Sequence, residues 1–202
     1  FTPSHTWFQV NNVRLSTPVL QQEWEAFVSE MGGTVSPKAT GSIDVKLLPS
    51  LPGIPMNQEE AYRLNITKKR ITVEAVTERG IYWAMQTLRQ LAETRNSKTQ
   101  IRGAEIIDWP AFRIRGFMQD VGRSYISLEE LKREIAVLAK FKINVFHWHL
   151  TENQSWRLES KIFPMLNDSA NTTRMPGKYY TLEEAKELVA FCKAHHMMLI
   201  PE

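Results

Sequence analysis

The sequence predicts an α+β domain over residues 1–108, followed by the first three strands of a (β/α)8 TIM barrel over residues 109–202. Three observations support this fold class. Short strands with period-two alternation mark the first half, strand and helix patterns alternate after Pro110, and polar residues follow each strand of the second half. Since such a barrel needs about 250 residues, we expect a truncated barrel here.

The composition is that of an ordinary globular protein. Of 202 residues, 43% are hydrophobic and 23% are charged, and the net charge is +3. The basic residues are scattered, so we expect no nucleic-acid partner and no membrane-binding basic patch. No apolar run approaches the ~20 residues of a membrane span. The single cysteine, Cys192, excludes an internal disulfide and lies on the apolar stripe of a predicted helix, where we expect it to pack.

The first half contains two predicted helices and three predicted strands. A helix over 19–31 stops at Gly32-Gly33, and a second over 77–93 places Ile81, Met85 and Leu88 on one face. Alternating strands cover 43–47, 62–66 and 71–76, and residues 67–70 form the tip of a hairpin between the last two. Because no histidine pair, acidic cluster or glycine-rich phosphate loop occurs here, we expect a structural role.

The second half alternates strand and helix. Strands are predicted over 114–120, 143–150 and 197–200. Ser127-Leu-Glu-Glu130 and Thr181-Leu-Glu-Glu184 are capping boxes, which begin helices. The first of these helices carries a core stripe of Leu131, Ile135, Leu138 and Phe141. This order predicts parallel strands joined by crossovers, with the functional site at their carboxyl ends. No Gly-x-Gly-x-x-Gly turn follows the first strand, which disfavours a dinucleotide-binding sheet.

His147 and His149 lie on one face of the second strand. One interpretation is a zinc site in a metal-dependent hydrolase, which would need further ligands from other strands. The other is a pair of interior histidines held by hydrogen bonds. Because His5, His195 and His196 are poorly placed to complete a site, we predict no metal and no cofactor.

The residues after the second strand suit a sugar. Glu152, Asn153, Trp156 and Arg157 offer a carboxylate, an amide, an indole and a guanidinium, and hydroxyls and the apolar face of a pyranose need such partners. Arg123 follows the first strand and can bind neighbouring hydroxyls with two hydrogen bonds. A surface loop with one buried tryptophan, and an arginine fixed by Asp120, are the alternatives.

Three stretches of the second half, 115–123, 142–157 and 199–202, resemble glycoside hydrolase family 20. Gly80 and residues 87–91 resemble the accessory domain of that family. The resemblance covers nearly the whole chain. It implies an exo-acting β-N-acetylhexosaminidase, with an N-acetylhexosamine-terminated glycan as its partner.

The resemblance also assigns the site residues. Arg123 matches the arginine that binds the hydroxyls of the terminal sugar, and Glu152 matches an aspartate that orients the catalytic network. The usual Asp-Asp is Glu152-Asn153 here. We expect residues that support this network at five positions: Asn153, His149, Trp156, Arg157 and Glu202.

The resemblance implies substrate-assisted retaining hydrolysis, in which an adjacent Asp-Glu pair holds the acetamide and protonates the leaving oxygen. We expect that pair beyond Glu202, so no catalytic residue is present and the chain alone is inactive. A truncated barrel would expose an apolar face and invite self-association. The open alternatives are a non-catalytic carbohydrate-binding module and a metal-dependent barrel hydrolase.

A periplasmic, cell-surface or secreted location is the final expectation. The chain begins without methionine, which suits removal of a leader. Four Asn-x-Ser/Thr sites suit a secreted eukaryotic protein: Asn65, Asn153, Asn167 and Asn171.

Overall fold

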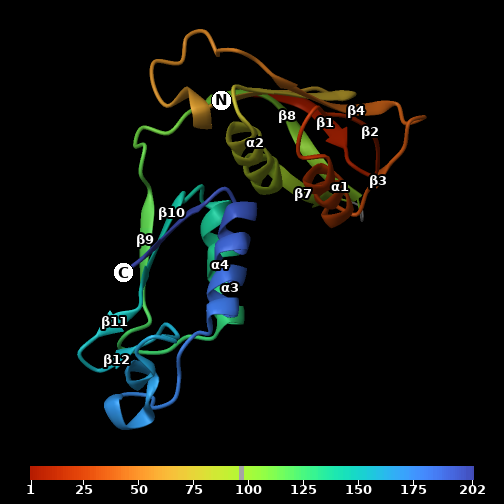
Figure 1. Ribbon diagram of the computed structural model, residues 1–202. Coiled ribbons are helices and arrows are strands. Elements are labelled where there is room, and N and C mark those ends of the chain that lie inside the picture. The colour runs from red at the N-terminus through yellow and green to blue at the C-terminus, as the bar shows by residue number, and fades with distance from the viewer. Residues whose placement is uncertain (96–97) are drawn as a thin grey trace. The chain divides into compact units, whose positions relative to one another are not determined.

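The computed structural model describes residues 1–95 and 98–202, which form two units, Phe1–Arg113 and Ile114–Glu202 (Figure 1). The first unit is built on a mixed sheet. Its elements in chain order are β1 (Thr2–Gln9), β2 (Asn12–Ser16), α1 (Gln21–Glu30), β3 (Thr34–Val35), β4 (Gly41–Leu47), a 3-10 turn (Gln58–Glu60), β5 (Tyr62–Ile66), β6 (Arg70–Ala75), α2 (Glu78–Leu91), β7 (Ala92–Arg95) and β8 (Lys98–Asp108).

The sheet of the first unit has the strand order β1-β8-β5-β6-β4-β2-β3, with β7 paired to β8. The pairs β6–β4, β4–β2 and β2–β3 are parallel, whereas β5 pairs antiparallel with both β6 and β8. The predicted hairpin is confirmed, because the amide of Thr67 donates to the carbonyl of Arg70 at 2.8 Å. The mixed sheet confirms the α+β class of this unit.

Both helices lie on one side of this sheet (Figure 1). Trp24 and Phe27 of α1 are fully buried, as are Ile81, Met85 and Leu88 of α2, which confirms the predicted stripe. The guanidinium of Arg89 on α2 donates to the carboxylate of Glu30 on α1 at 2.9 Å, and so ties the two helices together. The core of this unit therefore lies between the sheet and the helices.

The prediction for this unit was incomplete in two ways. Strands β1, β2, β3, β7 and β8 were not predicted from the sequence. The second helix was predicted to reach residue 93, but it ends at Leu91, and Ala92 begins β7, which pairs with β8. Helical periodicity alone does not detect this end, because the backbone of β7 pairs with β8, a strand that was not predicted.

The second unit is a strand–helix alternation with short insertions. Its elements are β9 (Gly116–Asp120), α3 (Leu128–Lys140), β10 (Val145–His149), β11 (Thr151–Glu152), β12 (Ser155–Trp156), two 3-10 turns (Pro164–Asn167 and Ser169–Asn171), α4 (Leu182–Ala194) and β13 (Met198–Pro201). Strand β10 lies between β13 and β9 and is parallel to both. The predicted parallel pairing is confirmed, whereas the barrel remains a prediction.

Both predicted capping boxes are present. The hydroxyl of Ser127 accepts from the backbone amide of Glu130, and the carboxylate of Glu130 accepts from the backbone amide of Ser127. Thr181 and Glu184 repeat this arrangement at α4. Leu131 and Ile135 are fully buried. The core position predicted for Phe141 was wrong: the helix ends at Lys140, so the ring leaves the stripe and is 73% exposed.

Cys192 is buried on α4, as predicted, and burial raises the pKa of its thiol to about 12. The group is therefore a packed, unreactive thiol. Within residues 1–95 and 98–202, no helix combines the length and the hydrophobicity that crossing a bilayer would require.

Candidate functional site

The carboxyl ends of the three parallel strands bring charged side chains together. Asp120 at the end of β9 is in register with His149 at the end of β10. Glu202 follows β13, where its backbone carbonyl accepts from Leu150 at 2.6 Å and its amide donates to Trp148 at 3.0 Å. Side chains two residues apart on a strand share a face, so His147 and His149 both reach toward Glu202.

Glu202 and Glu152 hold His149 from two sides. The carboxylate of Glu202 lies 2.5 Å from Nδ1 of His149 and 3.0 Å from Nε2 of His147. The other ring nitrogen of His149, Nε2, lies 3.1 Å from the carboxylate of Glu152. When both carboxylates are ionised they only accept hydrogen bonds, so both nitrogens of His149 donate and the ring is an imidazolium.

Arg123 continues this network through its guanidinium. Its Nη1 donates to Asp120 at 2.6 Å, its backbone amide donates to the same carboxylate at 3.0 Å, and its Nη2 contacts the Oε1 of Glu152. Glu152 thus bridges Arg123 and His149 through one oxygen. The side chain of Arg123 remains 51% exposed. It is both fixed in direction and accessible to a ligand.

The pKa values follow from these contacts. Hydrogen bonds to Glu202 and then Glu152 raise the pKa of His149 above its usual range, and the same bonds from His149 and His147 lower the pKa of Glu202. Partial burial acts to raise the pKa of Asp120, but hydrogen bonds from the amide and guanidinium of Arg123 outweigh it and lower the pKa. These contacts therefore favour the ionised forms of His149, Glu202 and Asp120.

The remaining predicted residues are placed around this network. Asn153 is exposed, and its backbone N–H donates to the carboxylate of Glu152 at 3.4 Å. Trp156 lies on β12, opposite Thr151, and is 37% exposed. Arg157 is fully buried and donates to backbone carbonyls rather than to Glu152 or Glu202. The structure therefore joins Arg123, Glu152, His149 and Glu202 directly.

Two family models match almost the whole chain. The model described as glycosyl hydrolase family 20, domain 2, matches residues 10–109, and the catalytic-domain model of the same family matches residues 112–202. The chain belongs to glycosyl hydrolase family 20.

Curated relatives and solved structures agree with the family 20 assignment. A beta-hexosaminidase of Porphyromonas gingivalis is 39% identical over 158 residues, covering 72% of this chain and 20% of its own length. A beta-hexosaminidase of Vibrio furnissii is 34% identical over 180 residues, covering 82% of this chain and 29% of its own length. The chain thus spans between a fifth and a third of the length of these relatives.

Two family 20 structures superpose on the whole of this chain or nearly so. The exo β-N-acetylglucosaminidase of Vibrio harveyi, in complex with N-acetylglucosamine, has a TM-score of 0.80 at 27% identity and covers 100% of this chain and 34% of that one. The β-N-acetylhexosaminidase of Bacteroides fragilis has a TM-score of 0.82 at 28% identity and covers 98% and 42%. The fold is therefore that of a family 20 N-terminal domain and the start of its catalytic domain.

One part of the family 20 network also has the donor set of a metal site. Ligand atoms of His147, His149 and Glu202 all lie within 4.8 Å of one another. Two imidazoles and a carboxylate suit Zn²⁺. The other histidines were poorly placed in the sequence to be further ligands, and Glu202 was not predicted as one. In the structure each of the two rings is already hydrogen-bonded to Glu202, so the three groups satisfy one another without an ion.

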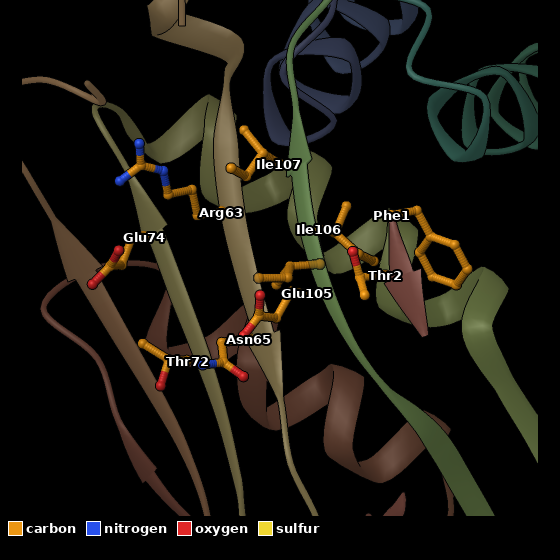
Figure 2. A pocket seen from close by; sticks show the side chains of 10 residues that line it. Phe1, Thr2, Arg63, Asn65, Thr72, Glu74, Glu105, Ile106 and Ile107 are labelled. Carbon is orange, nitrogen blue, oxygen red and sulfur yellow. The ribbon is translucent and has the colours of Figure 1, made fainter. Parts of the chain in front are cut away.

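Sequence reasoning also missed the hollow in the first unit of this family 20 chain. It has a volume of about 470 Å³ and lies on the exposed face of β5, β6 and β8 (Figure 2). Arg63, Glu74 and Glu105 are among its lining residues. The signal was present as the polar half of each alternating strand, but alternation alone predicts a solvated face.

Proposed function

We propose that the protein is a glycoside hydrolase, an exo-β-N-acetylhexosaminidase that removes terminal N-acetylhexosamine from glycans. The observation that carries this proposal is the exposed guanidinium of Arg123, fixed between Asp120 and Glu152 at the ends of parallel strands. The relatives are named beta-hexosaminidases, and a similar structure is titled as a complex with N-acetylglucosamine.

In this proposal Arg123 binds the hydroxyls of the terminal sugar. A guanidinium has five N–H donors in one plane. Its Nη1 contacts the carboxylate of Asp120, and its Nη2 contacts that of Glu152. The side chain is half exposed, and its remaining N–H donors can reach adjacent hydroxyls of the sugar. His149 is hydrogen-bonded to Glu152 and holds it in place, and Glu202 holds His149 in the same way. The network thereby orients the sugar before any bond is broken.

We further propose that hydrolysis is substrate-assisted and retaining. The acetamido oxygen of the sugar attacks the anomeric carbon, and a carboxylic acid protonates the leaving oxygen. The 202 residues contain no adjacent Asp-Glu pair. The residues described above therefore supply sugar positioning, and we expect this polypeptide alone to leave the glycosidic bond intact.

The proposal includes a (β/α)8 barrel that continues from β9, β10 and β13. Several apolar side chains on one face of this sheet are exposed, as the inner face of a barrel would be before further strands cover it: Met118, Met198 and Ile200. The same exposed side chains are the reason to expect self-association of the isolated chain.

The test is turnover of 4-nitrophenyl N-acetyl-β-glucosaminide and -galactosaminide by the full-length gene product, with the first-formed anomer identified by NMR. We expect nitrophenol release and a β-configured product, and no release from the 202-residue polypeptide. Absence of turnover of both substrates by the full-length product would refute the hydrolase assignment. An α-configured first product would refute the retaining mechanism.

A metal-dependent hydrolase is the second candidate, favoured by the convergence of His147, His149 and Glu202. It predicts stoichiometric zinc in the purified protein and loss of activity on chelation. The hexosaminidase proposal predicts the opposite: full activity after dialysis against EDTA, with elemental analysis finding no bound transition metal.

A further inference from the structure

Arg157 is a fully buried arginine whose hydrogen bonds all go to backbone carbonyls. Burial lowers the pKa of its guanidinium, as expected where no carboxylate compensates. Its three nitrogens reach five carbonyl oxygens: Val121 (3.0 Å), Gly122 (3.3 Å), Arg174 (2.8 Å), Met175 (3.1 Å) and Lys178 (2.7 Å). One planar group therefore joins the loop after β9 to residues 174–178.

The loop after β9 is fixed from both sides by these bonds. The amides of Val121 and Gly122 both donate to the carbonyl of His149, at 3.0 and 3.1 Å. The carbonyls of the same two residues accept from Arg157, and the hydroxyl of Ser155 also donates to Gly122. All four backbone groups of these two residues are thus engaged, immediately before Arg123.

The loop also packs tightly against the network. A Cβ atom on Gly122 would lie 3.2 Å from the Cβ and Cγ of Glu152. A small displacement of the loop would therefore move Arg123 relative to Glu152. Carboxylates hold the side chain and the backbone amide of Arg123, and the groups around Val121 and Gly122 hold the backbone that leads to it.

We propose that Arg157 is a positioning residue for sugar binding: it fixes the backbone from which Arg123 projects. This inference rests on the proposed function of Arg123. Lysine cannot replace Arg157, because a single ammonium group lacks the planar arrangement of five donors that spans both segments. Arg157 touches no substrate itself and acts through the loop.

The test is Arg157→Lys in the full-length product, with Arg133→Lys on the exposed face of α3 as the matched control. We expect roughly 10- to 100-fold lower kcat/KM, carried mainly by a higher KM, because misplacement of a binding group weakens sugar binding. The control should stay within about twofold of wild type. In this proposal Arg157 affects sugar binding only through the guanidinium of Arg123. The double variant Arg123→Lys with Arg157→Lys should therefore lose no more kcat/KM than Arg123→Lys alone.

Hydrogen exchange over residues 118–126 gives a readout that does not need activity. Arg157→Lys should accelerate exchange at Val121, Gly122 and Arg123, whereas the control should not. Unchanged exchange, or kinetic losses that add fully in the double variant, would overturn the inference. If the wild-type product cleaves neither substrate, the proposed function fails, but the exchange result still decides whether Arg157 fixes the loop.

Ser155→Ala provides a second variant in case Arg157→Lys does not fold. It removes the other donor to the carbonyl of Gly122 and leaves Arg157 in place. We expect the same changes in exchange and KM, at smaller size. Identical exchange and kinetics in Ser155→Ala and wild type would count against a role for this carbonyl in presenting Arg123.

Discussion

The two sheets of this chain use similar residues in different ways. In the mixed sheet of the first unit, polar side chains are spread along one face, and Arg63, Glu74 and Glu105 line an open hollow there. In the parallel sheet of the second unit, Asp120, His149 and Glu202 meet at one edge because all three strands end together. Strand direction, rather than composition, thus decides where charged groups converge.

The charged contacts of the two units differ accordingly. In the first unit, Lys46 and Glu74 lie 3.6 Å apart on the exposed face, and such solvated pairs contribute little to stability. The buried Glu60 accepts from the indole of Trp83 at 2.7 Å and serves the core. In the second unit each charged group is hydrogen-bonded to the next, and the groups remain partly exposed to solvent. This arrangement both holds the guanidinium of Arg123 and leaves it accessible.

The strongest test of this difference is a pair of arginine substitutions. Arg123→Ala in the full-length product should lower kcat/KM about 100-fold, because two or more charge-assisted hydrogen bonds to the sugar are lost. Arg63→Ala in the first unit should change kcat/KM less than about twofold. Steady-state kinetics on the nitrophenyl substrate measures both. Equal losses in the two variants would contradict a site confined to the second unit.

A glycine substitution tests whether the first unit serves stability. A Cβ on Gly80 of α2 would lie 2.4 Å from the backbone carbonyl of Ala61. Gly80→Ala should therefore lower the free energy of unfolding by about 1–3 kcal/mol through overpacking. Chemical denaturation measures this change. The control is Ser29→Ala on the exposed side of α1, and its free energy of unfolding should stay within about 0.5 kcal/mol of wild type. A stability equal to wild type would show that the helix can move off the strand freely.

The smallest expected effect is on the pH dependence of the network. The pKa of His149 is raised above 6.5, so its contribution to stability is complete below that pH and is lost as pH rises through the raised value. The pKa of Glu202 is lowered below 4.5, so its contribution is complete above that pH and is lost as pH falls through the lowered value. The network is therefore most stable between the two.

NMR titration of the His149 ring checks this window. Glu202→Gln removes the larger cause of the shift and should move the midpoint of His149 down toward 6.5, whereas Glu105→Gln in the first unit should leave it in place. Sugar affinity should also weaken above the midpoint of His149, because the ring loses a proton there and Glu152 loses its charged partner. A midpoint unmoved by Glu202→Gln would show that the contact with Glu202 does not hold the proton.

Local patterns predicted much of the fold. Both capping boxes begin helices at the expected residues, and the hairpin turns where the alternating runs are interrupted. Two kinds of error arose where strand pairing decides the conformation. Ala92 leaves the helix to pair with the nearby Ile101, and β1 pairs with β8 across some hundred residues. Helical periodicity does not detect the first pairing, and the second is too distant in sequence to leave a trace in a local window.

By itself, the sequence determined which residues stand at the strand ends, because alternation and capping locate each strand and helix. Arg123, Glu152 and His149 were candidates on that basis. Only the tertiary structure decided their partners: that Glu152 bridges Arg123 and His149, that Glu202 is the second acceptor, and that Arg157 serves carbonyls instead of carboxylates. The reason is physical, since hydrogen bonds depend on distances of about 3 Å between groups that the chain brings together only on folding.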